Sequence, residues 1–280
     1  MAAAFGVWEV RFPSSRAVYD EDDEEDEETS TSEDDSRNLN FHWAPHLKID
    51  QESSVTECPL MVLAVGEVAT TFVEAHYLSA GSEVVACLTS KRGNELEFEK
   101  QCNQFKSGDT CCLYRLTTNH DDSVFFQCRT PVPQEKAFHW TEKLFENLKP
   151  SKVVILTSLA ACEYHTNAPE NLKSDFVKVL KTDSWQEKIL HEECSFLETP
   201  NVMSGVAASV LQYCQIHSVA AALFVCFTES SHVDSQSVEA FQFLLKSPML
   251  HSLHQASSEQ VIKVLKSLRS GKLIEMTMYM

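Results

Sequence analysis

The ten cysteines of this chain are its most reactive side chains, because a thiolate can act as a nucleophile or bind a soft metal ion. One set combines residue types that ligate metals: Cys102, Cys111, Cys112, His120 and Cys128. Its spacing matches no standard zinc pattern, and no two cysteines of the chain are spaced Cys-x-x-Cys. We therefore expect no metal site and no bound cofactor, and we expect the cysteines within apolar segments to behave as small buried hydrophobic residues in a reducing compartment.

Common motifs of nucleotide-binding and hydrolytic enzymes are absent from the sequence. It contains no G-x-G-x-x-G, no G-x-x-x-x-G-K-[ST], no G-x-S-x-G and no H-E-x-x-H. A cysteine nucleophile that meets a distant histidine only in the folded chain stays open, so a cysteine-dependent enzyme on an α/β scaffold is the alternative. The leading expectation is a protein that is not an enzyme and works by binding and release.

The C-terminal residues Met278, Tyr279 and Met280 form a second group with chemical potential. Together they offer an apolar side chain, a phenol and a terminal carboxylate, which a basic pocket can bind. The other interpretation is a frayed chain end whose methionines pack locally.

The charge of the chain is concentrated near its N-terminus. Residues 20–35 hold 12 carboxylates and no Lys or Arg, so removing 12 from the net charge of -18 leaves -6 for the rest. Because these carboxylates repel one another and bury nothing, residues 1–55 are expected to be a disordered acidic N-terminal region. Within it, Ser30, Thr31 and Ser32 each precede an acidic residue by three positions, a pattern typical of acid-directed phosphorylation sites.

Two other interpretations of the acidic region remain: a solvating tail without partners, and an adaptor arm that binds a basic partner. The negative net charge argues against general nucleic-acid binding. No apolar run reaches the roughly 20 residues of a bilayer span, and Met1–Val10 has no cationic start. We therefore expect no membrane insertion and no secretory signal.

Short apolar runs alternate with helical patterns over the remainder of the chain, which predicts a single layered α/β domain with a largely buried mixed sheet flanked by helices. Strands are expected at Leu60–Val65, Glu83–Leu88, Thr110–Leu116, Val124–Arg129, Lys152–Leu156 and Ala220–Phe227. Helices are expected at Val68–Leu78, Gln134–Leu148, Asn171–Leu180, Met203–Ile216, Ser237–Leu245 and Ser257–Leu268. The domain is expected to span residues 56–270, followed by a flexible docking tail at 271–280.

Several segments resemble the proteasome assembly chaperone 1 family. They are Leu197–Val202, Ala207–Ile216, Ala222–Thr228 and Ser237–Phe241, with a looser match in the acidic N-terminal stretch and at Leu63–Gly66. The resemblance is clear over about residues 197–245 and diffuse elsewhere. Because these segments read as a helix, strands and their connections, they speak more for a shared fold than for a shared site.

The resemblance implies a chaperone for assembly of the 20S core proteasome. It implies a heterodimer with proteasome assembly chaperone 2 that holds proteasome α-subunits during α-ring formation and prevents off-pathway α-ring dimers. It also implies action in the cytoplasm, with association at the endoplasmic reticulum. The hydrophobic-Tyr-X order of the C-terminus resembles the tail by which proteasome activators dock between α-subunits, which assigns Tyr279 to a pocket wall and the Met280 carboxylate to a basic residue. Met278 departs slightly from that pattern, since Met is more flexible than Ile or Leu.

Overall fold

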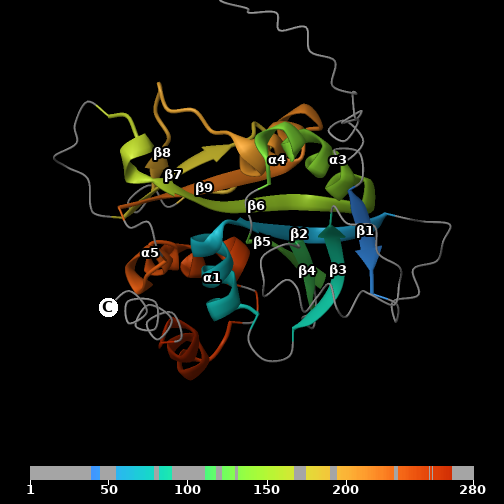
Figure 1. The fold of residues 1–280 in the computed structure, drawn as a ribbon, viewed down its shortest axis with the longest axis horizontal. Helices are drawn as coiled ribbons and strands as arrows, with labels where there is room; N and C mark the ends of the chain where they lie inside the picture. Colours follow the sequence, from blue (N-terminus) through green and yellow to red (C-terminus); the bar gives the residue numbers. More distant parts are fainter. Residues whose placement is uncertain are drawn as a thin grey trace, which may run out of the picture.

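A nine-stranded mixed sheet forms the centre of the part of the chain that the computed structural model describes (Figure 1). The described residues are 39–44, 55–78, 82–89, 111–117, 122–129, 132–166, 175–189, 194–229, 233–251, 253 and 255–266. The strands are β1 (Asn40–Trp43), β2 (Thr56–Val65), β3 (Glu83–Thr89), β4 (Cys111–Thr117), β5 (Asp122–Cys128), β6 (Leu148–Ala160), β7 (Phe176–Lys181), β8 (Ser195–Phe196) and β9 (Ala220–Thr228). Their order across the sheet is β1-β3-β4-β5-β2-β6-β9-β7-β8.

The parallel centre of the sheet consists of β5, β2, β6 and β9. Leu63 of β2 lies opposite Phe126 of β5 on one side and Ile155 of β6 on the other. These side chains are fully buried because helices cover both faces of the sheet, which explains the continuous apolar runs of the central strands. The predicted fold class is therefore confirmed.

Helices lie on both faces of the sheet (Figure 1). The helices are α1 (Glu67–His76), α3 (Ala137–Asn147), α4 (Gly205–Ile216), α5 (Ser235–Glu239) and α6 (Pro248–His251), and a further helical stretch covers residues 258–266. α3 and α4 pack on one face, and α1 and α5 cover the other. No helix within these described ranges is long and apolar enough to cross a membrane.

The turn from β2 into α1 requires glycine. Gly66 adopts a φ of 86°, a left-handed conformation that other residues rarely adopt, and its N–H donates to the carbonyl of Cys128 at 2.8 Å. This bond joins the start of α1 to the end of β5. The predicted sequence of strand, glycine and helix at this point is confirmed.

The helix predicted at Asn171–Leu180 is wrong. Phe176–Lys181 forms strand β7, and the residues just before it, 171–174, lie outside the described residues. Val177 and Val179 pack in the core on the α1 side, whereas Phe176 and Leu180 pack on the α3–α4 side. Apolar residues on both faces of a strand can imitate a helical stripe, and the sequence of this segment does not separate the two.

The helix predicted at Ser237–Leu245 is broken in the structure. A short α5 ends at Glu239, a 3-10 helix follows at Gln242–Lys246, and Pro248 begins α6. Asp234 caps α5: its side chain accepts from the N–H of Ser237, and the Ser237 hydroxyl accepts from the N–H of Asp234. The helix therefore begins directly after Asp234. Pro248 at a first helical position requires no backbone N–H donor, so it starts a helix here.

The first strand lies earlier in the chain than the predicted start of the domain at residue 56. β1 pairs with β3 in antiparallel register, and Phe41 and Trp43 pack against the core. Two aromatic anchors therefore bring Asn40–Trp43 into the sheet, within the span that was expected to be disordered. The helix predicted at Gln134–Leu148 corresponds to α3, which ends at Asn147, and β6 begins at the next residue.

Candidate functional site

The residues predicted to carry function lie outside the described residues. This applies to Met278, Tyr279 and Met280 at the C-terminus, and to Ser30, Thr31 and Ser32 in the acidic stretch. The structure therefore neither brings these residues together nor separates them, and their roles stay predictions. The described residues offer a different feature, a polar cluster that fixes a surface loop.

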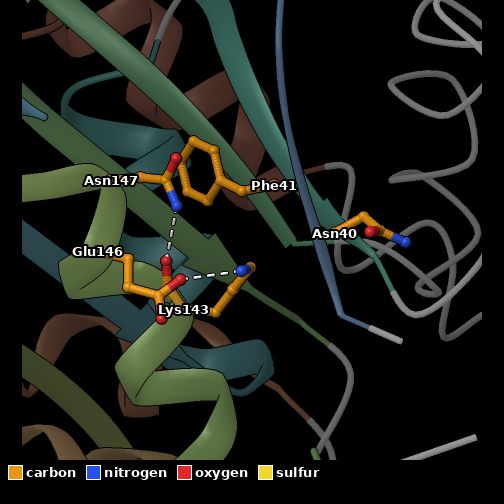
Figure 2. Close-up of a pocket in the computed structure, with 5 residues that line it drawn as sticks. All are labelled: Asn40, Phe41, Lys143, Glu146 and Asn147. Atoms are coloured by element: carbon orange, nitrogen blue, oxygen red, sulfur yellow. Dashed lines mark hydrogen bonds and ion pairs between the residues drawn. The ribbon is translucent and has the colours of Figure 1, made fainter. Parts of the chain in front are cut away.

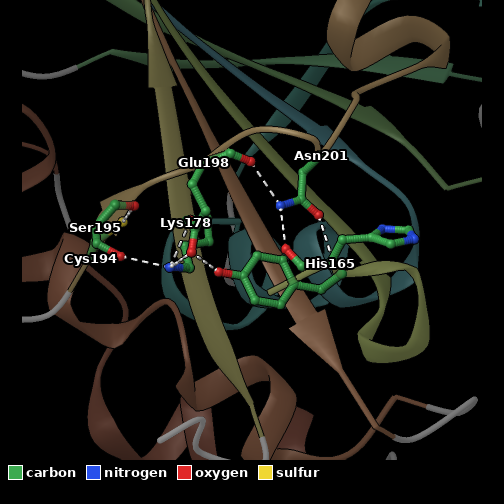
Figure 3. A network of polar contacts seen from close by, with 7 residues as sticks. His165, Lys178, Cys194, Ser195, Glu198 and Asn201 are labelled. Atoms are coloured by element: carbon green, nitrogen blue, oxygen red, sulfur yellow. Dashed lines mark hydrogen bonds and ion pairs between the residues drawn. The ribbon is translucent and has the colours of Figure 1, made fainter. Parts of the chain in front are cut away.

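Lys178 of β7 is the centre of this cluster (Figure 3). Its ammonium group donates to the Ser195 hydroxyl at 2.9 Å and lies 3.1 Å from a carboxylate oxygen of Glu198. It also lies 5.2 Å from the ring centroid of Tyr164, whose hydroxyl donates to the Glu198 carboxylate. Four residues from β7, β8 and the connections after β6 and β8 are thus joined by polar contacts.

The electrostatics of the cluster keep both ionic partners charged. Burial alone would lower the pKa of Lys178, but hydrogen bonds with Tyr164 and Glu198 outweigh burial and raise it. Burial alone would raise the pKa of Glu198, but hydrogen bonds from Tyr164 and Lys178 outweigh burial and lower it. Lys178 therefore stays an ammonium ion and cannot accept a proton from Ser195, which argues against a Ser–Lys catalytic pair and for a structural ion pair.

A second set of hydrogen bonds fixes the far end of the same loop. Asn201 accepts from the backbone N–H of His165 at 2.7 Å and donates to the carbonyl of His165 at 2.9 Å (Figure 3). The N–H of Leu197 donates to the carbonyl of Val179 at 3.0 Å. We call residues 195–204 the anchored loop, since both its strand end and its helix end are tied to neighbouring segments.

The anchored loop presents apolar side chains to solvent. Val202 is 83% exposed, and Phe196 at the other end of the loop is 44% exposed. An exposed valine on a loop without contacts to the body of the protein would be ordinary, but this one is held in place by neighbouring hydrogen bonds. Exposed apolar side chains mark a protein-binding surface when they gather into a patch.

A further apolar side chain, Phe138 of α3, is exposed at the same end of the α3–α4 pair. The helices α3 and α4 run in the same direction, because Thr141 bonds Ser209 at 2.9 Å and Phe145 stacks on Tyr213 at 4.2 Å, four residues further along each helix. Phe138, which is 62% exposed, therefore lies at the same end of the helix pair as the anchored loop that leads into α4. We call Phe138 and Val202 the apolar surface.

An open cavity of about 530 Å³ lies between β1 and the end of α3 (Figure 2). It is lined by Asn40, Phe41, Lys143, Glu146 and Asn147. The charges of Lys143 and Glu146 pair with each other at 2.8 Å, and Asn147 donates to the carbonyl of Lys143 at 2.9 Å. The lining charges thus satisfy one another, so the cavity offers little to a charged ligand.

The described cysteines do not support a thiolate nucleophile. Cys162 is exposed, whereas the other eight are buried. Burial raises the pKa of Cys58, Cys194, Cys214 and Cys226 to about 12 each, so these groups are thiols near neutral pH. Within the described part of the chain, no group of three or more His, Cys, Asp or Glu side chains is arranged to hold a metal ion.

The sequence did not point to the residues of the polar cluster around Lys178. Lys178 lies in the segment that was mistaken for a helix, and Tyr164 and Glu198 lie in connections. One available signal was a lysine flanked on both sides by apolar residues at Phe176–Lys181, since a buried lysine must find a partner. The segment Leu197–Val202 did stand out, but only through its resemblance to a family.

Comparison with known proteins gives one consistent result. A family model named PAC1, described as proteasome assembly chaperone 4, matches residues 1–280. The chain is 43% identical over 243 residues to proteasome assembly chaperone 1 of Nematostella vectensis, covering 86% of this chain and 93% of that protein. It is 33% identical over 289 residues to proteasome assembly chaperone 1 of Xenopus tropicalis, covering 98% of each.

A solved structure shows the same fold at low sequence identity. Pyrococcus furiosus PbaB, an archaeal proteasome activator, superimposes with a TM-score of 0.54 at 11% identity, covering 87% of this chain and all of that one. At this identity the match shows a shared fold alone.

Proposed function

The chain belongs to the PAC1 family of proteasome assembly chaperones, and on that premise we propose that it acts in assembly of the 20S core proteasome as a heterodimer with proteasome assembly chaperone 2. The heterodimer would hold α-subunits during α-ring formation and prevent off-pathway α-ring dimers. The protein would work by binding and release, without catalysis, in the cytoplasm and in association with the endoplasmic reticulum. Family membership is the observation that carries this proposal.

The C-terminal residues support a docking role. Met278, Tyr279 and Met280 supply an apolar side chain, a phenol and a carboxylate, which suit a pocket with an apolar wall and a basic residue. The 14 residues from 267 to 280 follow the last described helical stretch, and a chain of that length can span at most about 46–50 Å.

The apolar surface supports a second contact, which we assign to the heterodimer partner. Val202 and Phe138 are exposed, and the ion pair and hydrogen bonds of the anchored loop hold Val202 in place. A fixed apolar contact loses little conformational entropy on binding, which favours a stable partner over a transient one. The tail and the apolar surface would then serve different partners.

Capture from cells that co-express tagged chain, proteasome assembly chaperone 2 and α-subunits tests the tail. We expect a chain that ends at Met278 to capture at least tenfold less α-subunit and an unchanged amount of proteasome assembly chaperone 2. The reason is that the loss of Tyr279 and of the carboxylate at position 280 removes the docking groups without touching the domain. Equal capture of α-subunits by both chains would contradict the tail mechanism.

The same experiment with Val202→Glu tests the apolar surface. We expect this variant to lose proteasome assembly chaperone 2, because the partner would have to desolvate a carboxylate. Ile262→Glu is the matched control, since Ile262 is 49% exposed and belongs to the helical stretch that packs on the opposite face of the sheet. Failure of the unmodified chain to capture either partner would overturn the proposed function itself, whereas retention of the partner by Val202→Glu would overturn only the surface.

A further inference from the structure

Strand β4 begins with two adjacent cysteines, and each of them faces a cysteine on a neighbouring strand. Cys112 lies directly opposite Cys87 of β3 in the antiparallel register. On the other side, Cys112 lies opposite Gln127 of β5, so one further step in the same register places Cys111 opposite Cys128. Four thiols therefore run across three neighbouring strands.

The two cysteine pairs lie on opposite faces of the sheet, since successive residues of a strand alternate. Cys111 and Cys128 belong to the core on the α3–α4 side, whereas Cys87 and Cys112 form a small cluster with Ala44. All four are buried. The Sγ atoms of Cys111 and Cys128 are 2.7 Å apart, so the two sulfur atoms are in direct contact.

We propose that Cys111 and Cys128 form an oxidisable dithiol, which hydrogen peroxide converts into a disulfide that joins β4 to β5. Little backbone movement is required, because the sulfur atoms already touch and a disulfide needs them at about 2.05 Å. Bond formation would close a covalent loop of chain, with 17 positions separating the cysteines.

The chemistry balances in two steps. Cys111, which is 7% exposed against 0% for Cys128, reacts first with peroxide. Its sulfur attacks one peroxide oxygen, the O–O bond breaks, one water leaves and a sulfenic acid forms. The sulfur of Cys128 then attacks the sulfur of Cys111, so that the S–S bond forms, the S–O bond breaks and a second water leaves with the proton of Cys128. A dithiol reductant reverses the modification.

The surroundings of the pair set its rate. The hydrogen bond between the two thiols, together with burial, raises the pKa of the Cys128 thiol. Because both thiols are buried, peroxide is expected to react with the pair more slowly than with an exposed thiol. Cys162, which is exposed, provides an internal comparison within the same chain.

Peptide mapping of the folded, full-length protein tests the proposal. The protein is treated with hydrogen peroxide, free thiols are alkylated, and tryptic peptides are analysed by mass spectrometry without reduction. Cys111 and Cys112 share the peptide 107–115, and Cys128 lies in the peptide 116–129. We expect these two peptides to be linked in most of the oxidised protein and to separate after dithiothreitol.

Two single substitutions identify the participating sulfur. Cys111→Ser should abolish the link to peptide 116–129, whereas Cys112→Ser, the matched control on the same strand, should retain it. Fragmentation of the linked peptides from the unmodified protein gives the same assignment if either variant fails to fold. A link between peptides 107–115 and 49–91, which contains Cys87, would overturn the proposal. So would the absence of any link after peroxide treatment continued well beyond the exposure that fully oxidises Cys162.

Discussion

The strands β7 and β8, at one end of the strand order, and the strands β3 to β5, towards the other end, differ in the polar side chains that they carry. On the β7–β8 side, charged Lys178 and Glu198 are joined near the surface, and the loop that they hold exposes Val202. On the β3–β5 side, four thiols are buried among apolar residues. The first side combines order with an exposed apolar surface, which suits recognition, whereas the second combines order with burial, which suits stability.

Aromatic residues repeat this contrast. Phe126 of β5 is fully buried and meets Trp140 of α3 edge to face, with ring centroids 5.3 Å apart. Phe138 lies only two positions before Trp140 on the same helix, yet it is 62% exposed. One helix therefore contributes both to the core and to the apolar surface, and the two roles can be separated by substitution.

The largest effect on stability is expected from Phe126→Ala. Loss of a fully buried phenylalanine removes its packing and leaves a cavity, which costs about 3–5 kcal/mol in the free energy of unfolding. Phe138→Ala is the matched control and should cost less than about 0.5 kcal/mol, because an exposed ring loses little on truncation. Urea unfolding monitored by circular dichroism measures both, and similar losses in the two variants would show that the assigned division of roles is wrong.

An intermediate effect is expected from Lys178→Met, which keeps the aliphatic stem and removes the charge. The variant loses the hydrogen bond to Ser195 and the ion pair with Glu198, and we expect a loss of about 2 kcal/mol. Glu198 is 45% exposed, so water compensates part of its loss of a partner. Hydrogen exchange of the Leu197 amide, which donates to Val179, should become at least tenfold faster as the loop loosens.

Lys149→Met provides the control for this variant. Lys149 pairs with Glu57 at 3.1 Å, but the two side chains are 72% and 78% exposed. A pair of this kind contributes about 0–1 kcal/mol, so its removal should leave both the unfolding midpoint and the exchange of Leu197 nearly unchanged. If both lysine variants lose the same stability, the buried position of Lys178 has no special role and the anchored loop is not held by its charge.

Sequence patterns predicted much of the central sheet and little of the polar cluster. The runs Leu60–Val65 and Ala220–Phe227 are apolar without interruption, so any folded state must bury them, and both are strands. β7 was mistaken for a helix because its apolar residues serve two faces, a property that depends on neighbours from elsewhere in the chain. Hydrophobic patterns therefore predict which residues are buried more reliably than they predict which residues the buried ones contact.

The polar cluster could not be predicted for a related reason. Lys178 and Tyr164 lie in segments that meet only after β7 has paired with β9 and the chain has left β6. Tyr164 and Lys178 are 14 positions apart, and Glu198 lies a further 20 positions along the chain. No local sequence pattern relates residues at such separations. The predicted tail and acidic residues, by contrast, were identified from local patterns alone, and they lie outside the described residues.

The smallest effect concerns pH and involves α1, on the face of the sheet opposite the apolar surface. His76 is 7% exposed and its ring lies 4.9 Å from that of Phe72. Burial lowers the pKa of His76, so the folded protein favours the neutral imidazole. An unfolded histidine titrates at about pH 6.5. The stability that His76 contributes is therefore fully present above that pH. It is lost as the pH falls from there towards the lower pKa of the folded state.

We therefore expect His76→Gln to reduce the loss of stability between pH 7.5 and pH 5.5. Urea midpoints of the unmodified and variant proteins at both pH values give the difference that belongs to His76. Other groups titrate as well, and Asp175, whose pKa is raised by burial, acts in the opposite sense at more acidic pH. Because both proteins retain Asp175, its contribution cancels in the difference. Equal slopes in the two proteins would mean that His76 gains access to water or to a partner when protonated.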